Sequence, residues 1–199
     1  MTHKTLEGPL AKKNQRKSLP IVGALPFLAS TSSTPQEHKK HAPHSVHCAV
    51  ITVSDSKTET TDRGGPTIRA ALEKTGHAVA WSRVVRDEVL EIRAAVEAGL
   101  ADAHVQAVLL TGGTGIARRD VTIEALAPLM EKELPGFGEL FRALSFDEIG
   151  SAAFLSRATA GVARSKAIFA LPGSPAAVEL AMRELVVKEL GHMASLLAR

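Results

Sequence analysis

The chain has 199 residues, 45% apolar and 23% charged, which is enough for one domain of ordinary size with a sizeable core. Its single cysteine, Cys48, excludes an internal disulfide and opens an apolar run, which favours a buried side chain over a nucleophile. With one Trp and no Tyr, we expect no aromatic platform for single-stranded nucleic acid. Because no apolar run is long enough, we also expect no membrane span.

The formal net charge of +3 is unevenly distributed. Residues 1–47 hold seven Lys or Arg against two acidic residues, whereas the other 17 basic and 19 acidic residues give −2. Residues 1–45 also contain five prolines and a Ser/Thr run, and they show no sustained period. This composition predicts a disordered basic extension over 1–45 and one folded domain over 46–199. The basic pI is therefore weak evidence for nucleic-acid binding by the domain.

The extension leaves two alternatives open. Lys12–Lys17 followed by Leu19–Ala29 is similar to a signal peptide, but prolines interrupt the apolar part. Histidines at every third position (His38, His41, His44, His47) would hold transition metals only weakly, so we favour a solvated tail. One cysteine fits a reducing compartment, and we expect a cytoplasmic protein.

From residue 46 strands and helices alternate. The apolar runs predict strands at Cys48–Val53, His77–Val85, Val105–Thr111 and Lys166–Leu171. Helical periods and breakers predict helices at Gly64–Thr75, after Asp87, at Val121–Lys132 (shortened near Pro128), at Phe137–Ala153 and after Pro175. This order predicts an α/β fold whose parallel sheet is covered on both faces. In such sheets ligands bind beyond the carboxyl ends of the strands, where four candidate loops meet.

The most informative of these loops is the glycine-rich turn Gly112-Gly113-Thr114-Gly115 between a strand and a helix. Backbone N–H groups in such a turn approach an anion closely, and the helix start adds partial positive charge. The turn lacks the Lys-Ser/Thr of a P-loop and the G-x-G-x-x-G spacing of a dinucleotide fold. A phosphate site is therefore predicted here, and a tight turn without a ligand is the alternative.

Two carboxylates are candidates for Mg²⁺, a metal that often takes one or two carboxylates plus substrate phosphates. Asp120 follows Arg118 and Arg119, and Asp87 follows the second strand. The alternative for each is a helix cap. One of the two arginines would neutralise phosphate and the other would be solvated, and Glu124 either faces the site or lies on the surface.

The remaining candidates are polar residues and glycines in the other loops: Ser54, Gly64, Gly65, Glu139, Pro172, Gly173 and Ser174. We expect Ser54 and Glu139 to orient a ligand, Gly64 to permit close backbone approach, and Pro172-Gly173-Ser174 to join the same edge. Ordinary turn and capping roles are the alternative for each.

Four ordered motifs resemble the MoaB/Mog family of molybdenum-cofactor biosynthesis proteins: VITVSDS at 50–56, LLTGGTGIARRDVTIEAL at 109–126, PGFGELFRALSFDEIGSAAFLSRATAG at 135–161 and IFALPGSP at 168–175. The resemblance covers about residues 46–199 and looks closest to the MoaB branch. It implies a three-layer α/β/α molybdopterin-binding domain. One departure is Asp62-Arg63-Gly64-Gly65, where many members have Asp-x-Ser-Gly.

The resemblance implies that the chain binds molybdopterin and transfers AMP from Mg-ATP to its terminal phosphate, with Asp87 and Asp120 holding Mg²⁺. It also implies a homotrimer or homohexamer and a molybdate-inserting partner protein. The alternative is a non-catalytic molybdopterin carrier or assembly subunit, which needs the glycine turn but not the paired carboxylates. A nucleic-acid-binding regulator that uses the basic extension is a more remote alternative.

Overall fold

The computed structural model describes residue 43 and residues 45–199. The expectations for residues 1–42 and 44, namely disorder, targeting and three of the four spaced histidines, lie outside the described residues.

A six-stranded sheet forms the centre of the domain, in the order β2-β1-β3-β6-β5-β4. Four neighbouring strands are parallel, and β5 and β4 continue the sheet in antiparallel pairing. The strands are β1 (His47–Val53), β2 (Ala78–Val85), β3 (Ala107–Thr111), β4 (Lys132–Glu133), β5 (Thr159–Ala163) and β6 (Lys166–Leu171). The three central parallel strands β1, β3 and β6 are almost wholly buried, as parallel strands covered on both faces should be.

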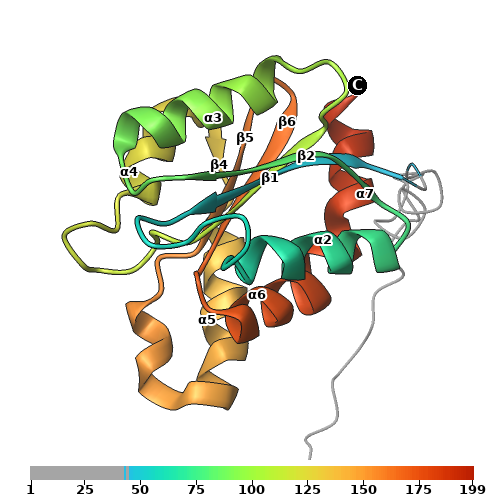
Figure 1. The fold of residues 1–199 in the computed structure, drawn as a ribbon. Helices are drawn as coiled ribbons and strands as arrows, with labels where there is room; N and C mark the ends of the chain where they lie inside the picture. The colour runs from blue at the N-terminus through green and yellow to red at the C-terminus, as the bar shows by residue number, and fades with distance from the viewer. Residues whose placement is uncertain (1–42, 44) are drawn as a thin grey trace, which may run out of the picture. The chain divides into compact units, whose positions relative to one another are not determined.

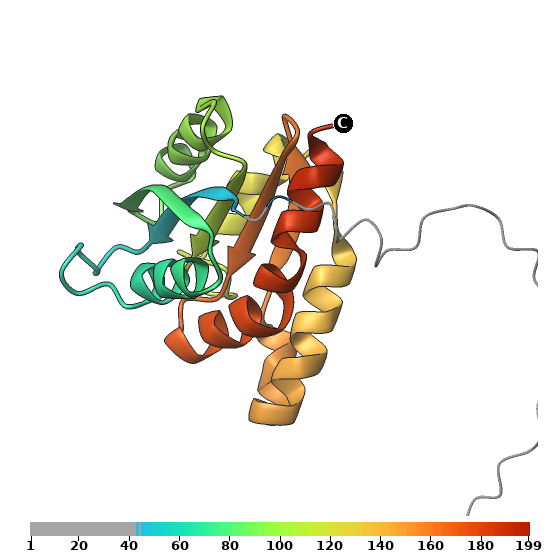
Figure 2. The ribbon, with the colours of Figure 1, turned by 90° about the vertical axis from the view of Figure 1, so that its right-hand side faces the viewer.

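Helices cover both faces of this sheet (Figures 1 and 2). On one face lie α3 (Val89–Ala101) and the short α4 (Thr122–Leu126), whose Leu126 belongs to the same buried apolar cluster as Ile51, Val108 and Ile168 of the sheet. The other face carries α2 (Gly64–Lys74), α5 (Pro135–Ile149), α6 (Pro175–Ala181) and α7 (Val187–Leu197). A π-helical turn, η3 (Met182–Val186), joins α6 to α7. The predicted three-layer α/β/α fold with a mostly parallel sheet is confirmed.

The predicted helix Val121–Lys132 is shortened near Pro128, as expected: it consists of α4 and one 3-10 turn, η1 (Ala127–Leu129), because Pro128 cannot continue an α-helix. The structure differs from the prediction mainly in the segment that follows, up to residue 163. The predicted helix Phe137–Ala153 is α5 followed by a 3-10 segment, η2 (Gly150–Leu155). The break falls at Gly150, whose φ is +63°. The apolar pattern of the sequence does not predict strands β4 and β5.

Within the described part of the chain, none of the helices combines the length and the apolar character that crossing a membrane requires.

Candidate functional site

The carboxyl ends of the central strands lie level with one another. Thr52 of β1 pairs with Thr111 of β3, and Thr111 pairs in turn with Leu171 of β6. The amide of Gly112 donates to the carbonyl of Leu171 at 3.1 Å, and the hydroxyl of Thr111 donates to the carbonyl of Pro172 at 2.7 Å. The loop after β6 therefore joins the glycine turn, as predicted.

The glycine turn requires glycine in its first two positions. Gly112 has φ +101° and Gly113 has φ +62°, in the region that favours glycine. A Cβ on Gly112 would lie 2.2 Å from the carbonyl oxygen of Val53. Thr122 fixes the turn from the other side, because its hydroxyl donates to the carbonyl of Gly112 at 2.8 Å and its amide to that of Gly113 at 3.0 Å.

Both predicted magnesium ligands lie against this turn. A Cβ on Gly113 would be 2.9 Å from Oδ1 of Asp87, and one on Gly115 would be 2.7 Å from Oδ2 of Asp120. Asp120 Oδ2 accepts the amide of Ala117 at 2.8 Å, within its own loop. Neither carboxylate caps a helix, because α3 and α4 have no side-chain cap. The capping alternatives for these two residues are therefore wrong.

Asp55, which sequence reasoning does not single out as a functional residue, joins the loop after β1 to the loop after β2. Asp87 Oδ2 accepts the amide of Asp55 at 2.8 Å, and Asp55 Oδ1 accepts the amide of Asp87 at 3.2 Å. Arg119 donates to both Asp55 oxygens at 2.9 Å and to Glu88 at 2.7 Å. Of the two predicted arginines, Arg119 is held by carboxylates, whereas Arg118 is exposed and makes no hydrogen bond or ion pair with any described residue.

These contacts move the two carboxyl pKa values in opposite directions. The hydrogen bonds from Arg119 lower the pKa of Asp55. Burial raises the pKa of Asp87, and the negative charges of Asp55 and Asp120 raise it further. A carboxyl group with a raised pKa among other acids is typical of a functional site, because a bound cation would remove the repulsion.

Arg157 also reaches the glycine turn; it lies within the 135–161 motif, but the sequence alone assigns it no role. Its Nε donates to the carbonyl of Gly115 at 2.8 Å, and its Nη2 donates to the carbonyl of Asp120 at 2.8 Å. Nη1 forms an ion pair with Glu124 at 2.5 Å, which lowers the pKa of Glu124. Glu124 is thus engaged by an arginine on the rim of the site.

Three other predicted residues have structural contacts. The hydroxyl of Ser54 accepts the amides of Ser56 and Lys57, at 3.3 and 3.2 Å, as in an ordinary turn. Ser174 caps α6 by accepting the amide of Ala177 at 3.4 Å. A Cβ on Gly64 would meet Thr111 at 2.9 Å, so this glycine lets α2 approach β3 closely.

Glu139 lies farther along the same side of the molecule, on α5. It is exposed and lines a cavity of about 420 Å³ together with Arg142, Phe154 and Arg157. Arg157 connects this cavity to the glycine turn through its bond to Gly115. Glu139 therefore lies beside the strand-end loops rather than within them.

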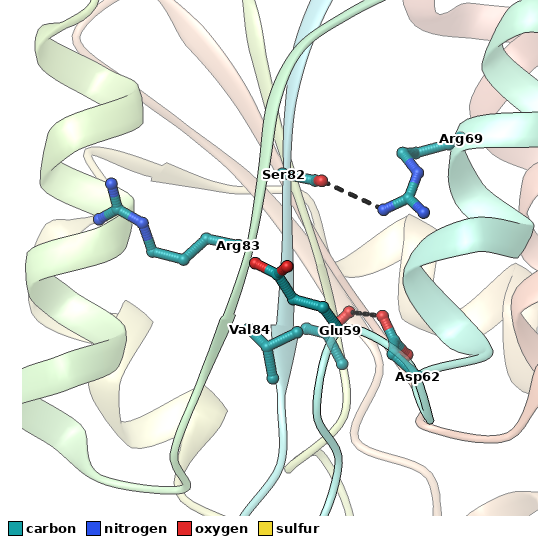
Figure 3. Close-up of a pocket in the computed structure, with 7 residues that line it drawn as sticks. Glu59, Asp62, Arg69, Ser82, Arg83 and Val84 are labelled. Atoms are coloured by element: carbon teal, nitrogen blue, oxygen red, sulfur yellow. Dashed lines mark hydrogen bonds between the residues drawn. The ribbon is translucent and has the colours of Figure 1, made fainter.

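A second, polar pocket of about 280 Å³ opens between β2 and α2 (Figure 3). On its floor, Thr52 donates to Asp62 at 2.6 Å, and Asp62 also accepts the amides of Gly64 and Gly65. Arg69 faces Ser82 and donates to it at 3.1 Å, whereas Arg83 turns away, over the ring of Trp81. Asp62, at the end of the polar loop after β1, thus anchors the start of α2.

The donor set at the glycine turn fits a magnesium ion better than a metal that needs a full protein cage. Among the described residues there is no group of three or more His, Cys, Asp or Glu that could hold a metal. Asp87 and Asp120 provide two carboxylates beside one glycine turn, and Mg²⁺ commonly takes its other ligands from water and substrate phosphates.

Comparison with known proteins agrees with this geometry. Residues 49–192 match the family model described as a probable molybdopterin binding domain. The chain is 55% identical over 159 residues to molybdenum cofactor biosynthesis protein B of Bacillus subtilis, covering 79% of this chain and 94% of that protein. The chain belongs to the MoaB/Mog family of molybdenum-cofactor biosynthesis proteins.

Solved structures of the family share the fold. A crystal structure of molybdenum cofactor biosynthesis protein B is 48% identical, with a TM-score of 0.77, and covers 79% of this chain and 99% of that one. The tungsten cofactor synthesizing protein MoaB from Pyrococcus furiosus is 40% identical with a TM-score of 0.69, covering 76% and 96%. Membership supports a molybdopterin-binding protein of cofactor biosynthesis, and AMP transfer goes beyond it.

Proposed function

We propose that the chain is a molybdopterin adenylyltransferase that uses Mg-ATP. An oxygen of the terminal phosphate of molybdopterin forms a bond to the α-phosphorus of ATP, the bond from that phosphorus to the bridging oxygen breaks, and pyrophosphate leaves. Such a transfer depends on positioning and charge neutralisation rather than on a covalent intermediate.

The observation that carries the proposal is the position of Asp87 and Asp120 against one glycine turn. The two carboxylates would hold Mg²⁺, which when bound neutralises phosphate charge. The amides of Gly112–Gly115 would bind a phosphate group, and Arg118, free of protein partners within the described chain, would add positive charge. Ser54 and Glu139 would orient the pterin or the nucleotide.

The adenylylated product would pass to a partner that inserts molybdate. The resemblance further supports a homotrimer or homohexamer, and large apolar side chains stand exposed on α5 and η2, among them Phe146 at 59% and Phe154 at 73%. The buried free thiol of Cys48 suits a reducing compartment, so we propose that the protein acts in the cytoplasm. Light scattering of the purified protein measures the assembly.

The deciding experiment incubates purified protein with Mg-ATP and molybdopterin and detects adenylylated molybdopterin and pyrophosphate. Asp87→Asn and Asp120→Asn should each abolish AMP transfer while molybdopterin binding remains. Asp147→Asn, an exposed carboxylate on α5, is the matched control and should retain activity. If the wild type makes no product, the protein is a non-catalytic molybdopterin carrier.

A further inference from the structure

One arginine outside the sequence motifs of the strand-end loops holds the glycine turn and Asp120 together. Arg157 lies just after η2, far from both in sequence. Its Nε and Nη2 donate to the carbonyls of Gly115 and Asp120, each at 2.8 Å. Its own amide donates to the carbonyl of Thr114 at 3.3 Å, so the main chain at Arg157 contacts the same turn.

The two accepting carbonyls stand at either end of an exposed segment whose other bonds are those of Ala117 with Asp120 and of Arg119 with Asp55 and Glu88. Residues 116–119 are exposed, and Ile116 at the start of the segment is 71% exposed. A segment with so few apolar contacts has low local stability. Because a peptide group is planar and trans, fixing the carbonyls of Gly115 and Asp120 also fixes the direction of the next amides, those of Ile116 and Val121.

The remaining edge of the guanidinium reaches the helix that follows Asp120. Nη1 and Nη2 lie 2.5 and 3.3 Å from the two carboxylate oxygens of Glu124 in α4. Arginine presents donors in a rigid fork, so one side chain can hold turn, carboxylate residue and helix in a single geometry. A lysine ammonium at the same place cannot donate in this planar pattern.

We infer that Arg157 is a positioning residue that orients Asp120 and the glycine turn for the phosphorylated ligand. This inference rests on the proposed function, because it assigns Arg157 to the same site. Arg157 need not touch the reacting atoms, since it acts through the main chain of Gly115 and Asp120.

Arg93 provides a matched control, because it also bonds to α4. It extends from α3 and donates to the carbonyls of Ala125 and Glu124, at 3.1 and 3.2 Å. Both arginines therefore donate to main-chain carbonyls, but only Arg157 reaches the turn. If α4 loses support, the thermal midpoint should fall in both Arg157→Ala and Arg93→Ala. If the glycine turn loses its position, kcat should fall only in Arg157→Ala.

The experiment compares Arg157→Ala, Arg157→Lys and Arg93→Ala with wild type. It measures the thermal midpoint, the Kd for Mg-ATP and for molybdopterin, and kcat and KM for AMP transfer separately. We expect Arg157→Ala to lower kcat by roughly 100-fold, the scale of a small misplacement at a reacting centre. Arg157→Lys should recover the thermal midpoint but not kcat. Arg93→Ala should lower the midpoint and keep kcat within about threefold of wild type.

Two outcomes overturn the inference: a kcat in Arg157→Ala within about threefold of wild type, or an equal loss in Arg93→Ala. If Arg157→Ala does not fold, the kcat of Arg157→Lys decides by the same criteria. If wild type makes no adenylylated product, the proposed function fails separately. The Kd values then decide. The inference requires that Mg-ATP or molybdopterin bind to the Arg157 variant more than about tenfold more weakly than to wild type. Unchanged affinities for both ligands overturn the positioning role of Arg157.

Discussion

Asp55 and Asp87 bond to each other reciprocally, each accepting the backbone amide of the other, at 2.8 and 3.2 Å. The loops after β1 and β2 are therefore joined at the point where Asp87 faces the glycine turn. Because both side chains are acidic, these bonds bring two negative charges together, and of the two only Asp55 is hydrogen-bonded by Arg119. Asp87 is left as the carboxyl group with the raised pKa.

Asp55→Asn should lower the pKa of Asp87. The substitution keeps the backbone amide that Asp87 accepts and removes one of the charges that raise its pKa. The acidic limb of AMP transfer, which requires ionised Asp87, should move to lower pH. NMR titration of the Asp87 carboxyl carbon measures the shift without any activity. An unchanged or higher pKa would contradict the assignment of Asp55 as the repelling charge.

The raised pKa of Asp87 also affects how the stability of the folded state depends on pH. Since the pKa of Asp87 is raised in the folded state, its contribution to stability is most favourable below the ordinary carboxyl pKa and declines as pH rises through the folded value. Asp55, with a lowered pKa, contributes stability above the ordinary carboxyl pKa and loses it as pH falls through the folded value. Its exposure to solvent keeps that contribution small.

Gly113→Ala should destabilise the fold and weaken ligand binding together. Gly113 has φ +62°, and the new Cβ would lie 2.4 Å from Oγ1 of Thr122 and 2.9 Å from Oδ1 of Asp87. The backbone cost alone is about 1 kcal/mol, and displacement of Thr122 adds to it. Urea unfolding measures the loss, and calorimetry measures Mg-ATP binding.

Gly136→Ala is the control for this substitution, because a Cβ at Gly136 would meet nothing within 4 Å and its φ is not positive. In the first turn of α5 it should be neutral or slightly stabilising. Equal stability of the two variants would show that the turn tolerates a side chain.

The sequence predicts the centre of this fold better than its margin. Strands β1, β3 and β6 are continuous apolar runs because helices cover both faces, and their predicted limits lie within two residues of those observed. Strand β5, TAGVA, is made of small residues, and β4 has only two exposed ones, so neither carries a strong period. They are defined by pairing beyond β6, which is a tertiary effect.

The candidate site likewise contains some residues that the sequence predicts and others that it does not. Glycines and acids that directly follow strands can be selected from the sequence, because parallel topology gathers them at one edge. Arg157 cannot be selected in this way, because it follows a 3-10 segment rather than a strand. Its motif does not reveal that it binds main-chain carbonyls 37 and 42 positions away. Asp55 lies two residues after β1, as Asp87 lies two residues after β2, so the same rule could have selected it. The rule does not specify the reciprocal bonds between the two residues.

Asp62→Ala should cost about 2–4 kcal/mol of unfolding free energy. The buried carboxylate accepts the hydroxyl of Thr52 and the first two amides of α2, so the substitution leaves three donors without their partner. Thr52→Val removes one of these bonds and should cost about 1 kcal/mol. Glu59→Ala, an exposed residue in the same pocket, should stay within about 0.5 kcal/mol of wild type. A loss in Asp62→Ala no larger than in Glu59→Ala would refute the capping role.

Arg119→Gln should move the pKa of Asp87 in the direction opposite to Asp55→Asn. The guanidinium lowers the pKa of Asp87 through its charge, so its removal should raise that pKa and shift the acidic limb of activity to higher pH. The ion pairs of Arg119 with Asp55 and Glu88 involve side chains that are 42–53% exposed, so the thermal midpoint should change little. In the double variant with Asp55→Asn the two shifts should partly cancel. Shifts of the same sign in the two single variants would mean that loop rearrangement, rather than charge, sets the pKa of Asp87.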